Sequence, residues 1–243
     1  MTMRAELTSV FHQGHLEAFC PFRVILNYHQ AAMPCSYSCF ISYRNPHNKG
    51  AQKLIESFHE ELSTHLALRV SAPAYLDVKR LQGGDLYNPK LAEGICQSSC
   101  VILLYSPTYL ESVYCAREFR GAVQLEAKRL PILSQKNLAQ NLSLVIPVMF
   151  RGASLPTELR RSTKPFEFTK TLLRRRDFQT QAAAEIMDKI AEAVFVRHRS
   201  LAKVPEATDC QGDFELPTAE EVEPWRRSVL DSLPVESAPG YAA

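Results

Sequence analysis

The sequence predicts an α/β fold in which five parallel strands form a doubly wound sheet of order 2-1-3-4-5. Five short apolar segments alternate along the chain with segments of helical period. One of them, residues 99–106 (SCVILLYS), is a continuous apolar run typical of a strand buried on both faces of a parallel sheet. The composition, with 46% hydrophobic and 22% charged residues, is that of a globular domain with a sizeable core.

The first predicted strand is the apolar run Cys39-Phe40-Ile41, which leads into the polar residues 42–46. Apolar residues at helical spacing over 50–66, with acidic residues on the other side, predict a helix next. The same alternation predicts the remaining elements: a strand over 68–77 interrupted by a proline, a loop over 78–88, a helix over 89–97, the central strand 99–106, a helix over 109–129, a strand over 142–150, a short strand over 165–170 and a helix over 179–199.

The two ends of the chain differ from this domain, which we place at residues 35–199. Residues 1–34 favour neither period and stay an unassigned N-terminal extension. Residues 200–243 hold nine acidic and three basic residues and five of the 15 prolines, so we expect an acidic, mostly disordered tail. The alternative for part of it is one short amphipathic turn formed by Trp225, Val229, Leu230 and Leu233.

Charge and hydropathy exclude several classes of partner. The net charge of +2 is too close to neutral for nucleic acid binding without a clustered basic surface. A basic cluster over 160–176 lacks interleaved aromatic residues, so we expect a solvated surface that could attract the acidic tail in low salt. No apolar run approaches the roughly 20 residues that span a bilayer. Charged residues interrupt the first 30 positions, which excludes a signal peptide and favours a cytoplasmic location.

The cysteines favour reduced core residues over a metal site. The seven cysteines are an odd number in a chain far larger than a disulfide-stapled domain. The pairs Cys35/Cys39 and Cys96/Cys100 lack the tight Cys-x-x-Cys spacing of a zinc knuckle, so we expect no metal. No P-loop and no Gly-x-Gly-x-x-Gly sequence follows a predicted strand, so the phosphate cradle of nucleotide-dependent kinases and dehydrogenases is missing from the sequence.

The predicted topology places a site where the first and third strands end, because ligands of such sheets bind at that switch point. A carboxylate follows the third strand at a suitable place. In Ser112-x-x-Cys115-x-x-Glu118, three-residue steps align the three side chains along one stripe of a helix. From spacing alone, Glu118 is either a functional carboxylate or a solvated surface residue.

Four segments together resemble a Toll/interleukin-receptor/resistance (TIR) domain: residues 38–44 (SCFISYR), 77–84 (DVKRLQGG), 95–107 (ICQSSCVILLYSP) and 109–119 (YLESVYCAREF). The first, second and last resemble that family's first strand, its BB loop and its third-helix box. The resemblance covers about residues 35–199 and implies a flavodoxin-like sheet. It implies one of two functions, since some TIR domains are scaffolds that signal through TIR–TIR contacts and others cleave NAD at the nicotinamide–ribose bond.

The Ser-x-x-Cys-x-x-Glu box is similar to that of the NAD-cleaving TIR domains, whose catalytic glutamate matches Glu118. The resemblance therefore implies an immune or cell-death effector that hydrolyses NAD+ to ADP-ribose or to a cyclised form. NAD+ is then the substrate, and no separate cofactor is expected. The substrate-binding residues that the resemblance implies are Ser42, Tyr43, Arg44, Asn45, Asp77, Leu81, Gly83, Ser112 and Cys115. For Arg44 a surface ion pair is the alternative.

The resemblance also implies protein partners. The loop 78–87, with Val78 at its start and Tyr87 at its end, resembles the loop through which TIR domains associate. An upstream sensor protein would then bring several copies together and raise their activity. The alternative function is a non-catalytic TIR adaptor that signals by TIR–TIR association.

Overall fold

The computed structural model describes residues 35–46, 48–76, 87–138, 142–150, 155–160, 164–168, 178, 180–209 and 214–233. The elements discussed below lie in these ranges. The N-terminal extension 1–34, the loop 77–86 and the basic residues 174–176 lie outside the described residues.

The sheet has five parallel strands in the order β2-β1-β3-β4-β5, which confirms the predicted fold class. The strands are β1 (Cys39–Tyr43), β2 (Ala74–Leu76), β3 (Val101–Tyr105), β4 (Val145–Met149) and β5 (Phe166–Glu167). Every residue of β1, β3 and β4 is buried, as expected for central strands that helices cover on both faces.

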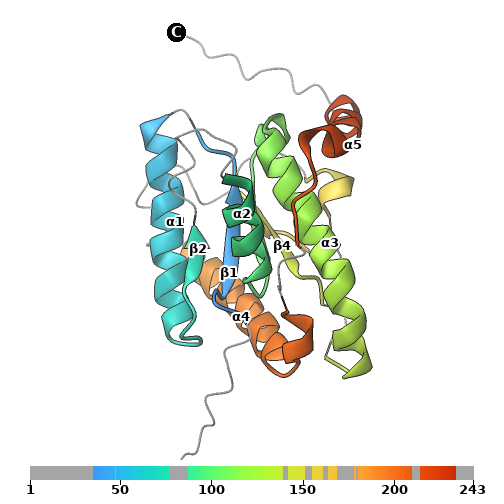
Figure 1. Ribbon diagram of the computed structural model, residues 1–243. Coiled ribbons are helices and arrows are strands. Elements are labelled where there is room, and N and C mark those ends of the chain that lie inside the picture. Colours follow the sequence, from blue (N-terminus) through green and yellow to red (C-terminus); the bar gives the residue numbers. More distant parts are fainter. Residues whose placement is uncertain are drawn as a thin grey trace, which may run out of the picture. The chain divides into compact units, whose positions relative to one another are not determined.

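Helices cover both faces of this sheet (Figure 1). On one face lie α1 (Lys49–Ala67) and α4 (Gln181–Ala202), and on the other lie α2 (Tyr87–Cys96), α3 (Val113–Gln135) and α5 (Ala219–Ser232). Three short 3-10 turns in the described residues are η1 (Tyr109–Glu111), η2 (Thr157–Leu159) and η4 (Pro205–Ala207).

The period of two along β1 decides which of its side chains face the α3 side of the sheet. Cys39, Ile41 and Tyr43 pack in the core between the sheet and the α1–α4 layer. Phe40 packs in the core on the α3 side, so Ser42, two residues further along, points to α3 as well. A polar residue near the end of a buried strand is thereby aimed at the helix that carries Glu118.

Two expected elements differ from the structure at their ends. The second strand covers only residues 74–76, because residues 68–70 form a turn after α1 in which Leu68 is 83% exposed. The predicted helix over 109–129 is divided into η1 and α3. Ser112 separates them, since it adopts an extended backbone and its hydroxyl caps α3 by accepting from the Cys115 N–H at 3.4 Å.

The expectation of a mostly disordered segment after residue 200 is wrong for residues 200–209 and 214–233. Helix α4 continues to Ala202, and Leu201 and Val204, both 0% exposed, belong to a buried core cluster. Helix α5 begins with a capping box, in which the Thr218 hydroxyl and the Glu221 carboxylate each accept from the other residue's backbone N–H. Val222 and Val229 are each 1% exposed and belong to the same core cluster as α3. The polar composition of the segment suggested that it could not offset the entropy lost when it becomes ordered. Burial of its apolar side chains against α3 offsets that loss.

Three buried charged side chains hydrogen-bond to backbone groups at the amino-terminal end of the sheet and hold the elements there together. Glu126 of α3 accepts from the Leu144 N–H at 2.5 Å and from the Ser143 hydroxyl at 2.6 Å, just before β4. Arg197 of α4 donates from Nε to the Ser143 carbonyl at 2.6 Å. Arg129 donates to three backbone carbonyls, those of Cys96, Ser98 and Ala207. These bonds satisfy buried backbone groups where strands and helices meet.

Candidate active site

Glu118 is fully buried on α3, with 0% of its surface exposed. The capped start at Ser112 fixes the phase of the helix, so that Cys115 and Glu118, three residues apart, both turn inward. The alternative of a solvated surface glutamate is therefore wrong. A carboxylate in this environment needs hydrogen bonds to compensate for the lost water.

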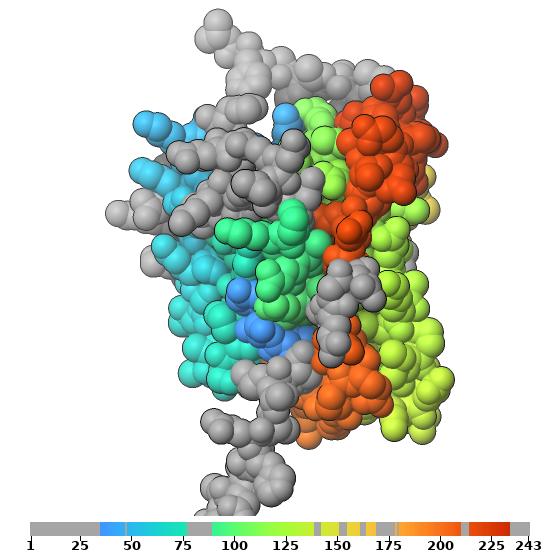
Figure 2. Space-filling view, viewed as in Figure 1, coloured from blue at the N-terminus to red at the C-terminus, as the bar shows by residue number. Residues whose placement is uncertain are grey.

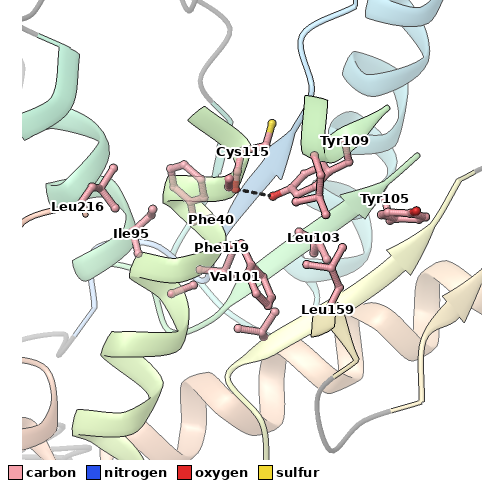
Figure 3. Packing of buried hydrophobic residues seen from close by; sticks show 14 of the residues in the cluster. Phe40, Ile95, Val101, Leu103, Tyr105, Tyr109, Cys115, Phe119, Leu159 and Leu216 are labelled. Carbon is pink, nitrogen blue, oxygen red and sulfur yellow. Dashed lines mark hydrogen bonds between the residues drawn. The ribbon is translucent and has the colours of Figure 1, made fainter. Parts of the chain in front are cut away.

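The Ser42 hydroxyl lies beside the Glu118 carboxylate, and the Tyr109 hydroxyl lies beside Ser42. The Ser42 hydroxyl donates to Glu118 Oε2 at 2.5 Å and lies 2.6 Å from the Tyr109 hydroxyl. The Tyr109 hydroxyl lies 3.2 Å from the Cys115 carbonyl oxygen as well, so its single proton can be donated either to that carbonyl or to the Ser42 oxygen (Figure 3). Strand β1, turn η1 and helix α3 thus contribute one residue each to a buried polar cluster of Ser42, Tyr109 and Glu118, which we call the hydroxyl–carboxylate cluster.

The hydroxyl–carboxylate cluster lies where the topology predicts a site. Ser42 is the fourth residue of β1 and pairs in register with Leu103, the third residue of β3. The chain leaves β1 toward α1 on one face and leaves β3 toward α3 on the other, so the β1–β3 boundary is the switch point of the sheet.

Two further predicted residues, Ser112 and Cys115, lie next to the cluster, and their contacts are structural. The Ser112 hydroxyl caps α3. Cys115 is 0% exposed, and its thiol donates to the Tyr43 carbonyl at 3.3 Å. The Tyr43 side chain packs on the opposite face of the sheet, so only its backbone reaches this region.

Arg44, immediately after β1, connects two loops at the rim of the site. It forms an ion pair with Glu111 and donates to the Thr108 carbonyl at 3.1 Å. The Arg44 side chain is 28% exposed and that of Glu111 is 52% exposed. The surface ion pair considered for Arg44 is therefore present, and it ties the end of β1 to η1. Asn45 follows and is half-buried.

The remaining predicted site residues, Asp77, Leu81 and Gly83, lie outside the described residues, as does the association loop before Tyr87. Sequence reasoning missed Tyr109, because it assigned that residue to the first position of a continuous helix over 109–129. A signal was available: Ser112 is a strong N-cap, so a helix that contains Glu118 should begin at Val113 and leave residues 109–111 as a separate turn.

The part of the chain that the structure describes contains no cluster of three metal-ligating side chains. Cys35, Cys39, Cys100 and Cys115 are buried free thiols, whereas Cys96 is disulfide-bonded, so the expectation of reduced cysteines is wrong for Cys96. Burial raises the pKa of the Cys100 thiol to about 12, which makes it a poor nucleophile and a poor ligand at neutral pH.

A flavodoxin-like α/β sheet with a glutamate at its switch point defines the class of this protein. The family model of the TIR domain matches residues 39–187, which is more than half of the chain. The chain therefore belongs to the TIR domain family, as its motifs suggested. No curated protein matches the chain. Within the described residues, none of the helices is long and apolar enough to cross a membrane.

Proposed function

We propose that the chain hydrolyses NAD+ at the nicotinamide–ribose bond with Glu118 as the catalytic carboxylate, in a cytoplasmic immune or cell-death effector. At family level, a TIR domain supports signalling or NAD cleavage. The observation that carries the proposal is the position of Glu118: the glutamate of the Ser-x-x-Cys-x-x-Glu box is buried at the switch point and accepts from the Ser42 hydroxyl, which the Tyr109 hydroxyl contacts in turn.

The chemistry requires little beyond a fixed carboxylate. The bond between ribose C1′ and the pyridinium nitrogen breaks, and its electron pair neutralises the cationic ring, so nicotinamide leaves as a neutral molecule without a general acid. The ribose becomes oxocarbenium-like, as in glycoside hydrolysis. Glu118 stabilises that positive charge and hydrogen-bonds the ribose hydroxyls. Water then bonds to C1′ and loses a proton to give ADP-ribose; attack by an adenine nitrogen instead gives the cyclic product.

The other residues of the site have supporting roles in this proposal. Ser42 donates to Glu118 and holds the carboxylate in one orientation, and the Tyr109 hydroxyl orients Ser42. Both hydroxyls can rotate toward a ribose oxygen when the substrate enters. Arg44 already bonds a carboxylate at the rim, and a pyrophosphate oxygen of NAD+ can replace Glu111 as its charged acceptor.

The burial of Glu118 makes opening of the site part of the proposed cycle. With 0% exposure, Glu118 reaches the ribose only after the groups above it move. TIR domains associate with one another in general. We propose that association through the loop 78–87, promoted by an upstream sensor protein, favours the open form.

Association predicts that activity per molecule rises with protein concentration, because a form populated only on association follows mass action. The measurement is the initial rate of nicotinamide release over about a hundredfold range of concentration, with light scattering at each point. A constant specific activity while scattering shows association would contradict this role of assembly.

The main test is direct. The purified full chain is incubated with NAD+, and nicotinamide and the ribose product are separated by chromatography. Glu118→Gln keeps the shape of the side chain and removes its charge, so we expect at least about a hundredfold loss of nicotinamide release. Circular dichroism and the unfolding midpoint show whether the variant remains folded. A folded Glu118→Gln protein with full activity would overturn the mechanism.

One observation favours the alternative of a non-catalytic adaptor: Glu118 is fully buried, and its carboxylate already accepts from Ser42. In that case the cluster only fixes the start of α3 against β1. The wild-type chain would then release no nicotinamide at any concentration, including those at which it associates.

A further inference from the structure

Residues 214–233 lie beyond the matched TIR region and run along α3 (Figure 2). The Arg117 Nε donates to the Pro217 carbonyl at 2.6 Å, which fixes the segment before α5 begins. Leu216 lies over Gly121, where a Cβ would come within 2.5 Å of the Leu216 side chain. A side chain at position 121 would therefore require Leu216 to shift from its place on α3.

Helix α5 continues this contact with aromatic and apolar side chains. The Trp225 ring stacks on Phe119, with centroids 5.5 Å apart and planes 14° from parallel. The Arg120 guanidinium lies 5.5 Å from the centroid of the Trp225 ring, close enough for a cation–π interaction. Phe119 follows Glu118 directly, so α5 packs on the part of α3 that carries the proposed catalytic residue.

Arg226 extends from α5 to η1. Its NH1 donates to the Leu110 carbonyl at 2.9 Å and to the Glu111 carbonyl at 3.2 Å. Glu223 accepts from the Arg226 Nε at 2.7 Å and from its NH2 at 2.9 Å, so the guanidinium is held by a two-pronged pair. Hydrogen bonds from Arg226 and Arg227 lower the pKa of Glu223 to about 2, so this carboxylate is ionised at neutral pH.

We propose that Arg226 is a positioning residue: by holding the η1 carbonyls, it fixes the Tyr109 hydroxyl against Ser42 and so keeps the Ser42–Glu118 hydrogen bond aligned. Turn η1 has only three residues and few backbone hydrogen bonds of its own, so outside contacts determine where it lies. Arg226 supplies two such contacts, and the Arg44–Glu111 ion pair supplies another. The catalytic part of this inference rests on the proposed function.

Arg227 provides a matched control. It follows Arg226 on the same helix and donates to the same carboxylate, from Nε to Glu223 at 2.6 Å, but its side chain is 73% exposed. Arg226→Gln and Arg227→Gln each remove one positive charge and one partner of Glu223. The two variants therefore differ in the contact with η1.

The first measurement is hydrogen exchange of the Glu111 and Ser112 amides in the full chain. The Glu111 amide donates to the carbonyl of Thr108, just before η1, and the Ser112 amide donates to the carbonyl of Tyr109, the first residue of η1. We expect at least about tenfold faster exchange in Arg226→Gln, wild-type rates in Arg227→Gln, and partial restoration in Arg226→Lys, which keeps the charge. Trp225 is the only tryptophan, so its fluorescence shows whether α5 stays docked.

The second measurement is the kinetics of NAD+ cleavage. We expect Arg226→Gln to lower kcat by roughly three- to thirtyfold with KM within about twofold of wild type, since a small misplacement of catalytic groups affects kcat first. Unchanged exchange in Arg226→Gln, an equal effect in Arg227→Gln, or a higher kcat in Arg226→Gln would each overturn the inference. Absence of NAD+ cleavage by the wild type would overturn the proposed function instead, and exchange would still decide whether Arg226 fixes η1.

Discussion

Helix α3 carries two buried glutamates that are held in different ways. Glu118 and Glu126 are 0% and 2% exposed and lie about two turns apart. Glu126 accepts from two backbone amides, at 2.5 Å and 3.2 Å, and from one serine hydroxyl. Glu118 accepts from the Ser42 hydroxyl, which in turn lies 2.6 Å from the Tyr109 hydroxyl.

This difference separates a structural glutamate from a functional one better than burial does. Backbone amides at the start of β4 point where the chain directs them, so the bonds of Glu126 cannot rearrange without moving the strand. A hydroxyl donor rotates about a single bond, so the bond that Ser42 donates to Glu118 can be exchanged for a bond to a substrate. The end of α3 nearer the carboxyl ends of the strands should therefore govern activity, and the other end should govern stability.

The largest effect that we expect from the comparison of Glu118 with Glu126 is the loss of stability in Glu126→Ala. The change removes the acceptor of the Leu144 and Val145 amides and of the Ser143 hydroxyl, all in a buried place. We expect a loss of about 2–4 kcal/mol in the free energy of unfolding, measured by urea denaturation. Nicotinamide release per folded molecule should stay within about twofold of wild type.

Glu118→Ala is the matched variant for the same experiment. The Ser42 hydroxyl that donates to Glu118 can turn to another acceptor or to water, so we expect the variant to lose at least about 1 kcal/mol less than Glu126→Ala. Equal losses for the two variants would remove the structural distinction between them.

A smaller effect is expected for Ser42→Ala, which deletes the hydroxyl that donates to Glu118. We expect kcat to fall about tenfold, equivalent to about 1.4 kcal/mol of transition-state stabilisation. Ser99→Ala is the control at the other end of the sheet, since Ser99 is also 0% exposed and also hydrogen-bonded, to His198. Equal losses of kcat in Ser42→Ala and Ser99→Ala would contradict the claim that the end of the sheet that carries Ser42 governs activity.

The sequence allowed most of the fold to be predicted because the strongest signals come from the sheet interior. The continuous apolar run that contains β3 has no other stable place than the centre of a sheet covered on both faces. The weak point was β2, whose three residues are half-buried and give little periodicity. Its expected length came from residues 68–73, which in fact lie in the turn after α1 and in the segment that leads into β2.

The candidate site could be predicted only in part. The spacing of Ser112, Cys115 and Glu118 placed three residues on one stripe of a helix, and the structure turns Cys115 and Glu118 inward. No pattern within one element pairs Ser42 with Tyr109, because that contact joins residues 67 positions apart. Contacts of this kind depend on how β1 and η1 are placed against α3, which is a tertiary property.

Helix α5 was missed because average composition hides a few well-placed residues. The acidic, proline-containing segment is polar overall, yet Val222, Trp225 and Val229 follow the three- and four-residue steps of one helix face. The capping box Thr218-x-x-Glu221 stands directly before them and was readable in the sequence. The segment packs through stacked rings and buried valines rather than through general charge attraction.

The smallest expected effect is a pH dependence that originates far from the proposed site, at His198. Its Nδ1 lies 2.7 Å from the Ser99 hydroxyl, next to the amino end of β3, and burial lowers its pKa below the usual 6.5. The unfolded chain therefore takes up a proton near pH 6.5 that the folded protein resists, so stability is retained above that pH and falls as the pH drops below it. Urea denaturation at pH 7.5 and 5.5 measures how much free energy of unfolding each protein loses between these two pH values. The wild type should lose more than His198→Gln, by less than about 1 kcal/mol.

The pH profile of nicotinamide release, taken where both proteins are folded, should be the same for the two, because His198 lies away from the hydroxyl–carboxylate cluster. Identical stability losses in both proteins would show that His198 does not resist protonation in the folded protein, and a shifted activity profile in His198→Gln would show that the two ends of the sheet are coupled.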